Sequence, residues 1–190
     1  LEEAGIEWGE VRVPMMFEKE KRRVVFLPIA SMTRTGQEQG GVAKVLDAIP
    51  KLLARHSGVN VLIHTHTYKL AKEISEGVAR SLKEAGDPRP VLTYTDSWGR
   101  DRVLEEFKGH AGGESGGTGA VLVASSMDRA VDLPGDLCRV QIIVKMPFAS
   151  LGSRQVSERL RGRMGQLWYT VNTVRSIMQM TGRAVRGVDD

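Results

Sequence analysis

Short, nearly continuous apolar runs rich in β-branched residues are the first feature of the hydrophobic pattern along the chain. Such runs are typical of strands buried within a sheet. They occur at residues 23–28, 59–64, 90–93, 120–124 and 139–144. Residues 120–124 and 139–144 are almost purely apolar, so we expect other elements to cover both faces of these two strands.

Between these runs, apolar residues recur three and four positions apart, which predicts helices with one buried face. The predicted helices span residues 39–54, 67–86 and 101–107. Thr67 is a suitable N-cap for the second helix and Gly86 a suitable stop, whereas Pro50 is expected to kink or end the first. Strands that alternate with helices predict an α/β fold with a mostly parallel central sheet.

In a parallel α/β sheet, ligands bind beyond the carboxyl ends of the strands. Polar segments follow three of the predicted strands, at residues 64–68, 125–136 and 145–150. The middle segment combines the hydroxyls of Ser125 and Ser126 with three carboxylates and Arg129. Hydroxyls and backbone amides at such a place can hold a nucleic-acid phosphate. Asp132 can anchor an arginine or a water near a nucleotide, or it can simply cap its loop.

Length and composition limit the class of protein. The chain has 190 residues, of which 41% are hydrophobic and 26% charged, as in an ordinary globular domain. Its apolar runs are too short to cross a bilayer and its first residues lack a secretion pattern, so we expect a cytoplasmic protein without a membrane partner. With Cys138 as the single cysteine and no Cys/His cluster at ligand spacing, we expect neither an internal disulfide nor a metal site.

The net charge is +4, and arginines concentrate in the last third of the chain. There, residues 179–186 place Gln179, Gly182, Arg183 and Arg186 at i, i+3, i+4 and i+7. This spacing predicts one helix face with two guanidiniums beside a glycine. Because the arginine fork fits phosphate oxygens, the octad is a candidate phosphate site, although taken alone it favours a solvated basic face.

Taken together, four segments resemble the second motor domain of superfamily-two helicases, in the branch that contains the DinG and XPD helicases. Residues 61–68 (Val-Leu-Ile-His-Thr-His-Thr-Tyr) are similar to the fourth motif of this family, and residues 121–136 to the fifth. Residues 140–148 resemble the strand and Pro-Phe that follow the fifth motif, and residues 179–186 resemble the sixth, Gln-x-x-Gly-Arg-x-x-Arg. The resemblance implies a RecA-like three-layer fold.

The resemblance also implies that this chain supplies one side of an ATP site whose other side, with most of the contacts to ATP and Mg²⁺, belongs to an N-terminal motor domain. The residues implied on this side are Arg183, Arg186, Gln179, Gly182, Asp132 and Gly135. Arg183 and Arg186 are implied as arginine fingers, with Gln179 positioning one of them or the attacking water. The sequence lacks Gly-x-x-x-x-Gly-Lys-Ser/Thr and Asp-Glu-x-His, so we expect this fragment alone to be inactive as an ATPase.

Single-stranded DNA is the other ligand that the resemblance implies. The implied contacts are Thr65, Tyr68, Ser125, Ser126 and Arg129. Tyr68 can stack on a base, although an aromatic residue at a helix start often serves packing. Where the family has Glu-Gly before Val-Asp, this chain has Arg129-Ala130, which adds positive charge and removes backbone freedom.

We therefore expect residues 1–22 to be a leading segment or linker and residues 23–190 to form a helicase C-terminal domain that is part of a larger chain. Two other functions stay open. One is an RNA helicase or nuclease-linked ATPase built on the same domain; Gln179 favours the DinG/XPD branch over DEAD-box enzymes, which usually have histidine there. The other is a non-catalytic nucleotide- or nucleic-acid-binding scaffold, which the Arg129-Ala130 departure favours.

Overall fold

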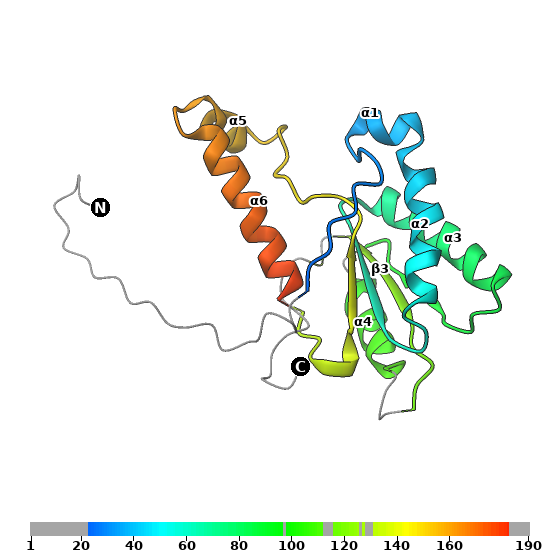
Figure 1. Cartoon of the computed structure of the whole chain (residues 1–190). Coiled ribbons are helices and arrows are strands. Elements are labelled where there is room, and N and C mark those ends of the chain that lie inside the picture. Colours follow the sequence, from blue (N-terminus) through cyan, green and yellow to red (C-terminus); the bar gives the residue numbers. More distant parts are fainter. Residues whose placement is uncertain (1–22, 97, 112–115, 126, 128–130, 183–190) are drawn as a thin grey trace.

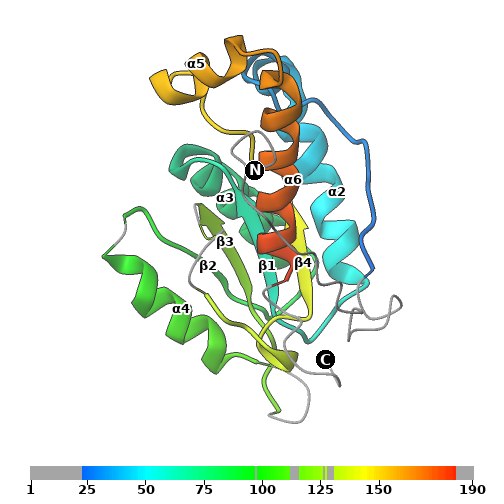
Figure 2. The same ribbon diagram turned by 90° about the vertical axis from the view of Figure 1, so that its left-hand side faces the viewer.

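A parallel sheet lies at the centre of the computed structural model, which describes residues 23–96, 98–111, 116–125, 127 and 131–182. Within these residues four strands pair in the order β2-β3-β1-β4. They are β1 (Val61–Thr65), β2 (Val91–Thr93), β3 (Val121–Ser125) and β4 (Val140–Ile143). All three pairings are parallel, which places β1 and β3 inside the sheet and β2 and β4 at its edges. Figure 1 shows the sheet among the helices, and Figure 2 labels its four strands.

Helices cover both faces of this sheet and form three layers with it (Figure 2). Helices α2 (Val42–Ala54) and α3 (Tyr68–Glu84) pack on one face, and α4 (Gly99–Gly109) packs on the other. The other α-helices of the described residues are α1 (Arg34–Gly36), which is a single short turn, α5 (Arg154–Arg161) and the long α6 (Gly165–Thr181). The predicted α/β, RecA-like three-layer architecture with a parallel sheet is therefore confirmed.

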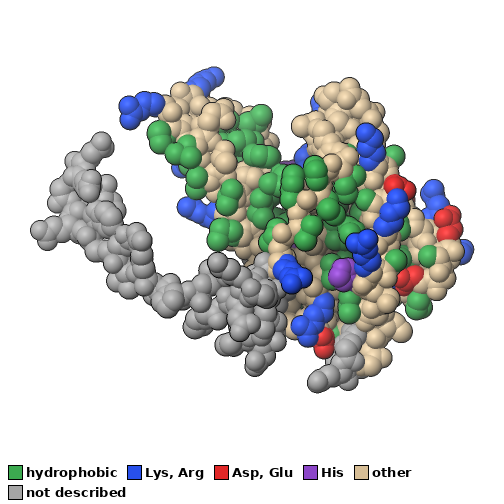
Figure 3. Space-filling view, in the orientation of Figure 1, with side chains coloured by type: hydrophobic (Ala, Val, Ile, Leu, Met, Phe, Trp, Pro, Cys, Tyr) green, Lys and Arg blue, Asp and Glu red, His purple; other side chains and the backbone are tan. Residues whose placement is uncertain are grey.

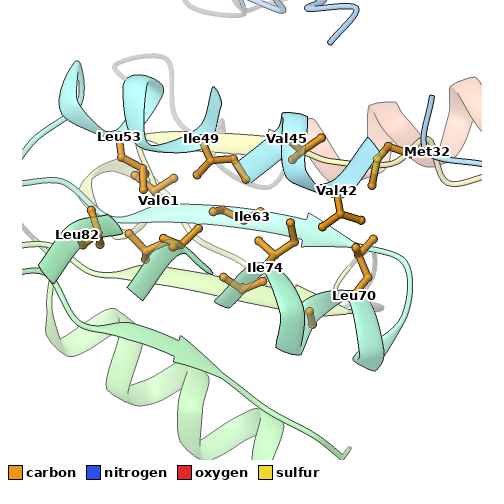
Figure 4. Close-up of a cluster of buried hydrophobic side chains, with 14 residues drawn as sticks. Met32, Val42, Val45, Ile49, Leu53, Val61, Ile63, Leu70, Ile74 and Leu82 are labelled. Atoms are coloured by element: carbon orange, nitrogen blue, oxygen red, sulfur yellow. The ribbon is translucent and has the colours of Figure 1, made fainter. Parts of the chain in front are cut away.

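The core consists of two clusters, one on each side of the sheet. Val61 and Ile63 of β1 point toward α2 and α3, where Ile74 is fully buried (Figure 4). Leu62 points the other way, toward Phe107 of α4. Successive side chains of a strand face opposite sides of a sheet, so a strand covered on both sides is apolar along most of its length. This accounts for the continuous apolar runs in β1 and β3.

Two predictions about strands are wrong. Residues 23–28 form no strand: they lie outside the sheet, with Val24 and Val25 each 75% exposed and Phe26 79% exposed. Residues 139–144 do contain a strand, but β4 is an edge strand and is only half-buried. In both cases the apolar, β-branched composition suits any pleated surface and does not specify which strands become neighbours.

Local signals placed both limits of α3 correctly but marked neither limit of α2. The Thr67 hydroxyl accepts the hydrogen bond that caps α3, and Gly86 adopts φ 68° just past its end, so both predictions are confirmed. The first long helix begins at Val42 instead of residue 39, because Gly40 has a left-handed φ of 86°. Pro50 lies inside α2 and does not end it.

Gly119 leads the chain into β3 with φ 76°, and a Cβ there would lie 2.6 Å from the carbonyl oxygen of Val59. Gly119→Ala is therefore expected to lower the free energy of unfolding by about 3 kcal/mol, because it adds a backbone clash to left-handed strain. Urea unfolding measures this loss. The matched control is Gly86→Ala, where φ is 68° and an added Cβ would meet no described residue within 4 Å apart from its chain neighbours, with an expected loss of about 1 kcal/mol. Equal losses would contradict the role of the close approach.

Candidate functional site at the carboxyl ends of the strands

The carboxyl ends of β1, β2 and β3 lie side by side, because the strands are parallel and in register. Thr65, the last residue of β1, pairs with Ser125, the last residue of β3. Both are buried, at 6% and 2% exposure. The Thr65 hydroxyl donates to the Ala124 carbonyl over 3.1 Å, so it links the two strands where they end. The structure thus brings together two of the residues predicted to contact DNA.

Two tyrosines extend this site toward the surface. Tyr68 is the first residue of α3 and is 42% exposed, whereas Tyr94 follows β2 and is buried. Their ring centroids are 6.1 Å apart at an angle of 76°, an edge-to-face contact worth about 1 kcal/mol. The Tyr94 hydroxyl donates to the carbonyl of Ser125. Tyr94 therefore holds the Tyr68 ring beside the end of β3.

Sequence reasoning missed Tyr94. The available signal was its position, since it is the first residue after the predicted strand at residues 90–93 and so lies at the same edge as Thr65 and Ser125. Its contact with Tyr68 could not be foreseen, because that contact depends on β2 lying beyond β3 in the sheet.

The side-chain hydroxyl of Ser125 has an unusual environment. It is buried, and no hydrogen-bond partner lies within reach among the residues that the structure describes. A buried hydroxyl without a partner costs about 1–3 kcal/mol, so such a group calls for a ligand or a further polar neighbour. This supports Ser125 as part of a polar binding site.

The described residues between β3 and β4 lie on the α4 side of the sheet. Val131 and Leu133 are buried in the cluster on the α4 side, and Asp132 between them is exposed. Gly135 has φ 56°, which allows the chain to turn into a short 3-10 helix. Asp132 and Gly135 thus lie in one surface loop. Ser126 and Arg129, from the same sequence motif, lie outside the described residues.

The C-terminal motif is described only at its start. Helix α6 ends at Thr181, with Gln179 exposed on its last turn and Gly182 directly after it. Arg183 and Arg186 lie outside the described residues, so the predicted helix face that contains them stays a prediction. The carbonyl of Thr181 accepts a hydrogen bond from the side chain of Gln141 in β4, which ties the end of α6 to the sheet.

Charged and apolar side chains are unevenly distributed over the face in Figure 3. The figure shows hydrophobic side chains along α6 and across the middle of this face, whereas basic side chains lie both at the α5 end and on the opposite side of the view. Four of the exposed apolar residues of α6 recur three and four positions apart: Leu167, Val171, Val174 and Met178. Exposed apolar stripes of this kind are typical of surfaces that contact another protein or domain.

The described residues meet the requirements of neither a metal site nor a reactive thiol. It contains no group of three or more His, Cys, Asp or Glu side chains that could hold a metal ion. Burial raises the pKa of the Cys138 thiol to about 12, so this thiol stays protonated at neutral pH and is a poor nucleophile or ligand.

None of the described helices is long and apolar enough to cross a membrane.

Comparison with known proteins adds one match. The sequence profile of the helicase C-terminal domain matches residues 50–190, from the last turns of α2 through the segment that follows α6. No curated protein matches the chain.

Proposed function

This chain belongs to the helicase C-terminal domain family, and we propose that it is the C-terminal motor domain of an ATP-dependent DNA helicase of the DinG/XPD branch. The observation that supports this best is the family match over residues 50–190, which includes both the cluster around Thr65 and Ser125 and the end of α6. The two regions are joined through the sheet, because β1 pairs with both β3 and β4. A motor domain needs this connection between its nucleic acid and its nucleotide.

On the nucleotide side, we propose that Arg183 and Arg186 reach ATP and Mg²⁺ held mainly by an N-terminal motor domain of the same protein. When bound, ATP supplies the phosphoryl group whose negative charge these guanidiniums stabilise. The exposed Gln179 on the last turn of α6 positions one arginine or the attacking water, and Gly182 allows close approach. We also assign Asp132 and Gly135 to the residues that contact the nucleotide. The exposed apolar stripe of α6 supports contact with a further domain.

On the DNA side, we propose that Tyr68 stacks on a base of single-stranded DNA while Thr65, Ser125, Ser126 and Arg129 line the path of the phosphates. The exposure of Tyr68 and its contact with Tyr94 support stacking, because a ring held at the surface loses little freedom on binding. The hydroxyl of Ser125 supports a polar ligand, since it is buried without a partner among the described residues.

Tyr68→Ala is expected to weaken binding of single-stranded DNA by about 5- to 30-fold, because stacking on an aromatic ring contributes about 1–2 kcal/mol per base. Fluorescence anisotropy with a labelled oligothymidine at several salt concentrations measures the affinity. The control is Tyr169→Ala, which removes a ring stacked on Phe148 at 5.2 Å in another part of the domain and should leave affinity unchanged. Equal affinity of Tyr68→Ala and the parent chain would contradict the proposed DNA site.

The same assay separates the alternatives. Tighter binding of oligouridine than of oligothymidine would favour an RNA helicase. Arg129→Glu should weaken binding to all sequences about equally and reduce the salt dependence, because contacts to phosphates carry no sequence information. A complete protein whose N-terminal domain lacks the P-loop lysine would instead favour the non-catalytic scaffold.

A further inference from the structure

We infer that His64 and Gln141 form a partly buried relay that anchors the last turn of α6 to the sheet and thereby positions the segment that begins at Arg183. The inference deepens the proposed function, since it assigns positioning residues to the ATP side of the site. It rests on hydrogen bonds between three elements that are far apart in the sequence: β1, β4 and α6.

The geometry of the relay is continuous from the core to the helix end. His64 is 2% exposed, and its Nε2 lies 2.9 Å from Oε1 of Gln141 on the neighbouring strand. Gln141 Nε2 in turn donates to the carbonyl of Thr181 over 3.3 Å. His64 and Gln141 face the same side of the sheet, because Gln141 pairs in register with Leu62, two residues before His64. One side chain of β4 therefore bridges β1 and α6.

The two hydrogen bonds determine the direction of every donor in the relay. The Thr181 carbonyl can only accept, so the amide nitrogen of Gln141 must face it. The amide oxygen of Gln141 then faces His64, whose Nε2 must carry a proton and donate. Gln141 is thus oriented by His64 and is not able to rotate without losing both bonds.

Thr181 is the position at which such an anchor has most effect. It is the last residue of α6, and the final carbonyls of a helix have no partner within the helix. The bond from Gln141 satisfies one of these carbonyls and holds the helix end against β4. From Thr181 the chain continues through Gly182 to Arg183, so the position of the last turn sets where the following segment starts.

A purely apolar pair at these two positions would fill the same space. Replacing both partners of a buried hydrogen bond by apolar groups of similar shape is often nearly neutral for stability. The polar pair therefore fixes the position of the end of α6 more than it stabilises the fold. Hydrogen bonds allow one arrangement of the helix end, whereas apolar contacts allow several. This difference makes the inference testable.

The first test measures the anchor in the 190-residue chain without any nucleotide. Gln141→Met keeps the length of the side chain and removes its donor and acceptor. Hydrogen exchange of the backbone amides at residues 178–182, followed by mass spectrometry, should become about 3- to 10-fold faster, while exchange in α3 stays unchanged. The matched control is Gln166→Met on the exposed first turn of α6, which should leave residues 178–182 unchanged.

A second variant covers the case in which Gln141→Met alone disturbs folding by removing the amide oxygen that accepts from His64. The double variant His64→Phe with Gln141→Met has apolar groups at both positions, and a cooperative thermal transition shows that it is folded. Faster exchange at residues 178–182 in this folded double variant supports the relay. Unchanged exchange in both variants overturns it.

The second test uses the complete helicase with its N-terminal motor domain. Gln141→Met should lower kcat for ATP hydrolysis about 10-fold and change KM by less than about twofold, as expected when a group acting in the transition state is misplaced. Unchanged kcat together with faster exchange overturns the positioning role. If Arg183→Ala also leaves kcat unchanged, the proposed function fails, and the exchange experiment alone still decides whether the anchor exists.

Discussion

Arg183→Ala in the complete helicase is expected to lower kcat for ATP hydrolysis by about 10³-fold or more, with a small change in the KM for ATP. An arginine finger contacts charge that develops only as the phosphoryl group is transferred, so its loss raises the energy of the transition state more than that of the bound substrate. Arg186→Ala should behave alike. Steady-state hydrolysis with saturating single-stranded DNA measures both effects.

Two controls make this result specific. Arg175→Ala removes an exposed arginine from the middle of α6 and should leave kcat near the parent value. Arg183→Lys keeps the positive charge but loses the planar fork of donors, so it should recover little of the lost activity. Near-normal rates in both alanine variants would mean that Arg183 and Arg186 are structural. The 190-residue chain by itself should show no turnover of ATP.

The second large effect is on stability. Asp87→Ala is expected to lower the free energy of unfolding by about 3–5 kcal/mol, because it leaves the guanidinium of Arg89 buried without its carboxylate. The Arg89 side chain is 1% exposed, and its Nη2 lies 2.6 Å from Oδ2 of Asp87. The same guanidinium donates to the carbonyls of Leu53 and His56 at the end of α2. Chemical unfolding in urea at pH 7 measures the loss.

A matched pair on the surface provides the control. Asp47 lies 2.6 Å from Lys51, the same distance as in the Asp87–Arg89 pair, but the two side chains are 73% and 71% exposed. Asp47→Ala should therefore change the free energy of unfolding by less than about 1 kcal/mol. Losses of similar size in the two variants would contradict the role of burial.

The effect of Asp87 should also depend on pH. The hydrogen bond from Arg89 lowers the pKa of Asp87, and this outweighs the opposite effect of burial. A carboxyl with a lowered folded pKa stabilises the fold fully above its unfolded pKa, about 3.9, and loses that contribution as the pH falls through the folded value. The difference between the parent and Asp87→Ala should thus be constant near pH 7 and shrink below about pH 4. A difference that stays constant down to pH 2 would contradict this assignment.

The sequence by itself determined the features that depend on neighbouring residues. The apolar run of β3 identified a strand covered on both faces, and the alternation of strands with helices predicted a parallel α/β sheet. Thr67 and Gly86 marked the limits of α3, because a cap and a left-handed stop are decided within a few residues. The position of Thr65 and Ser125 at one edge of the sheet followed from the same reasoning.

Only the tertiary structure decided which distant residues meet. Residues 23–28 stay outside the sheet and β4 becomes a half-buried edge, because strand composition does not encode the order β2-β3-β1-β4. The contact of Tyr68 with Tyr94 and the bonds from His64 through Gln141 to Thr181 arise from that order. Such pairs form through packing between elements far apart in the chain, which no local pattern of hydrophobic and polar residues records.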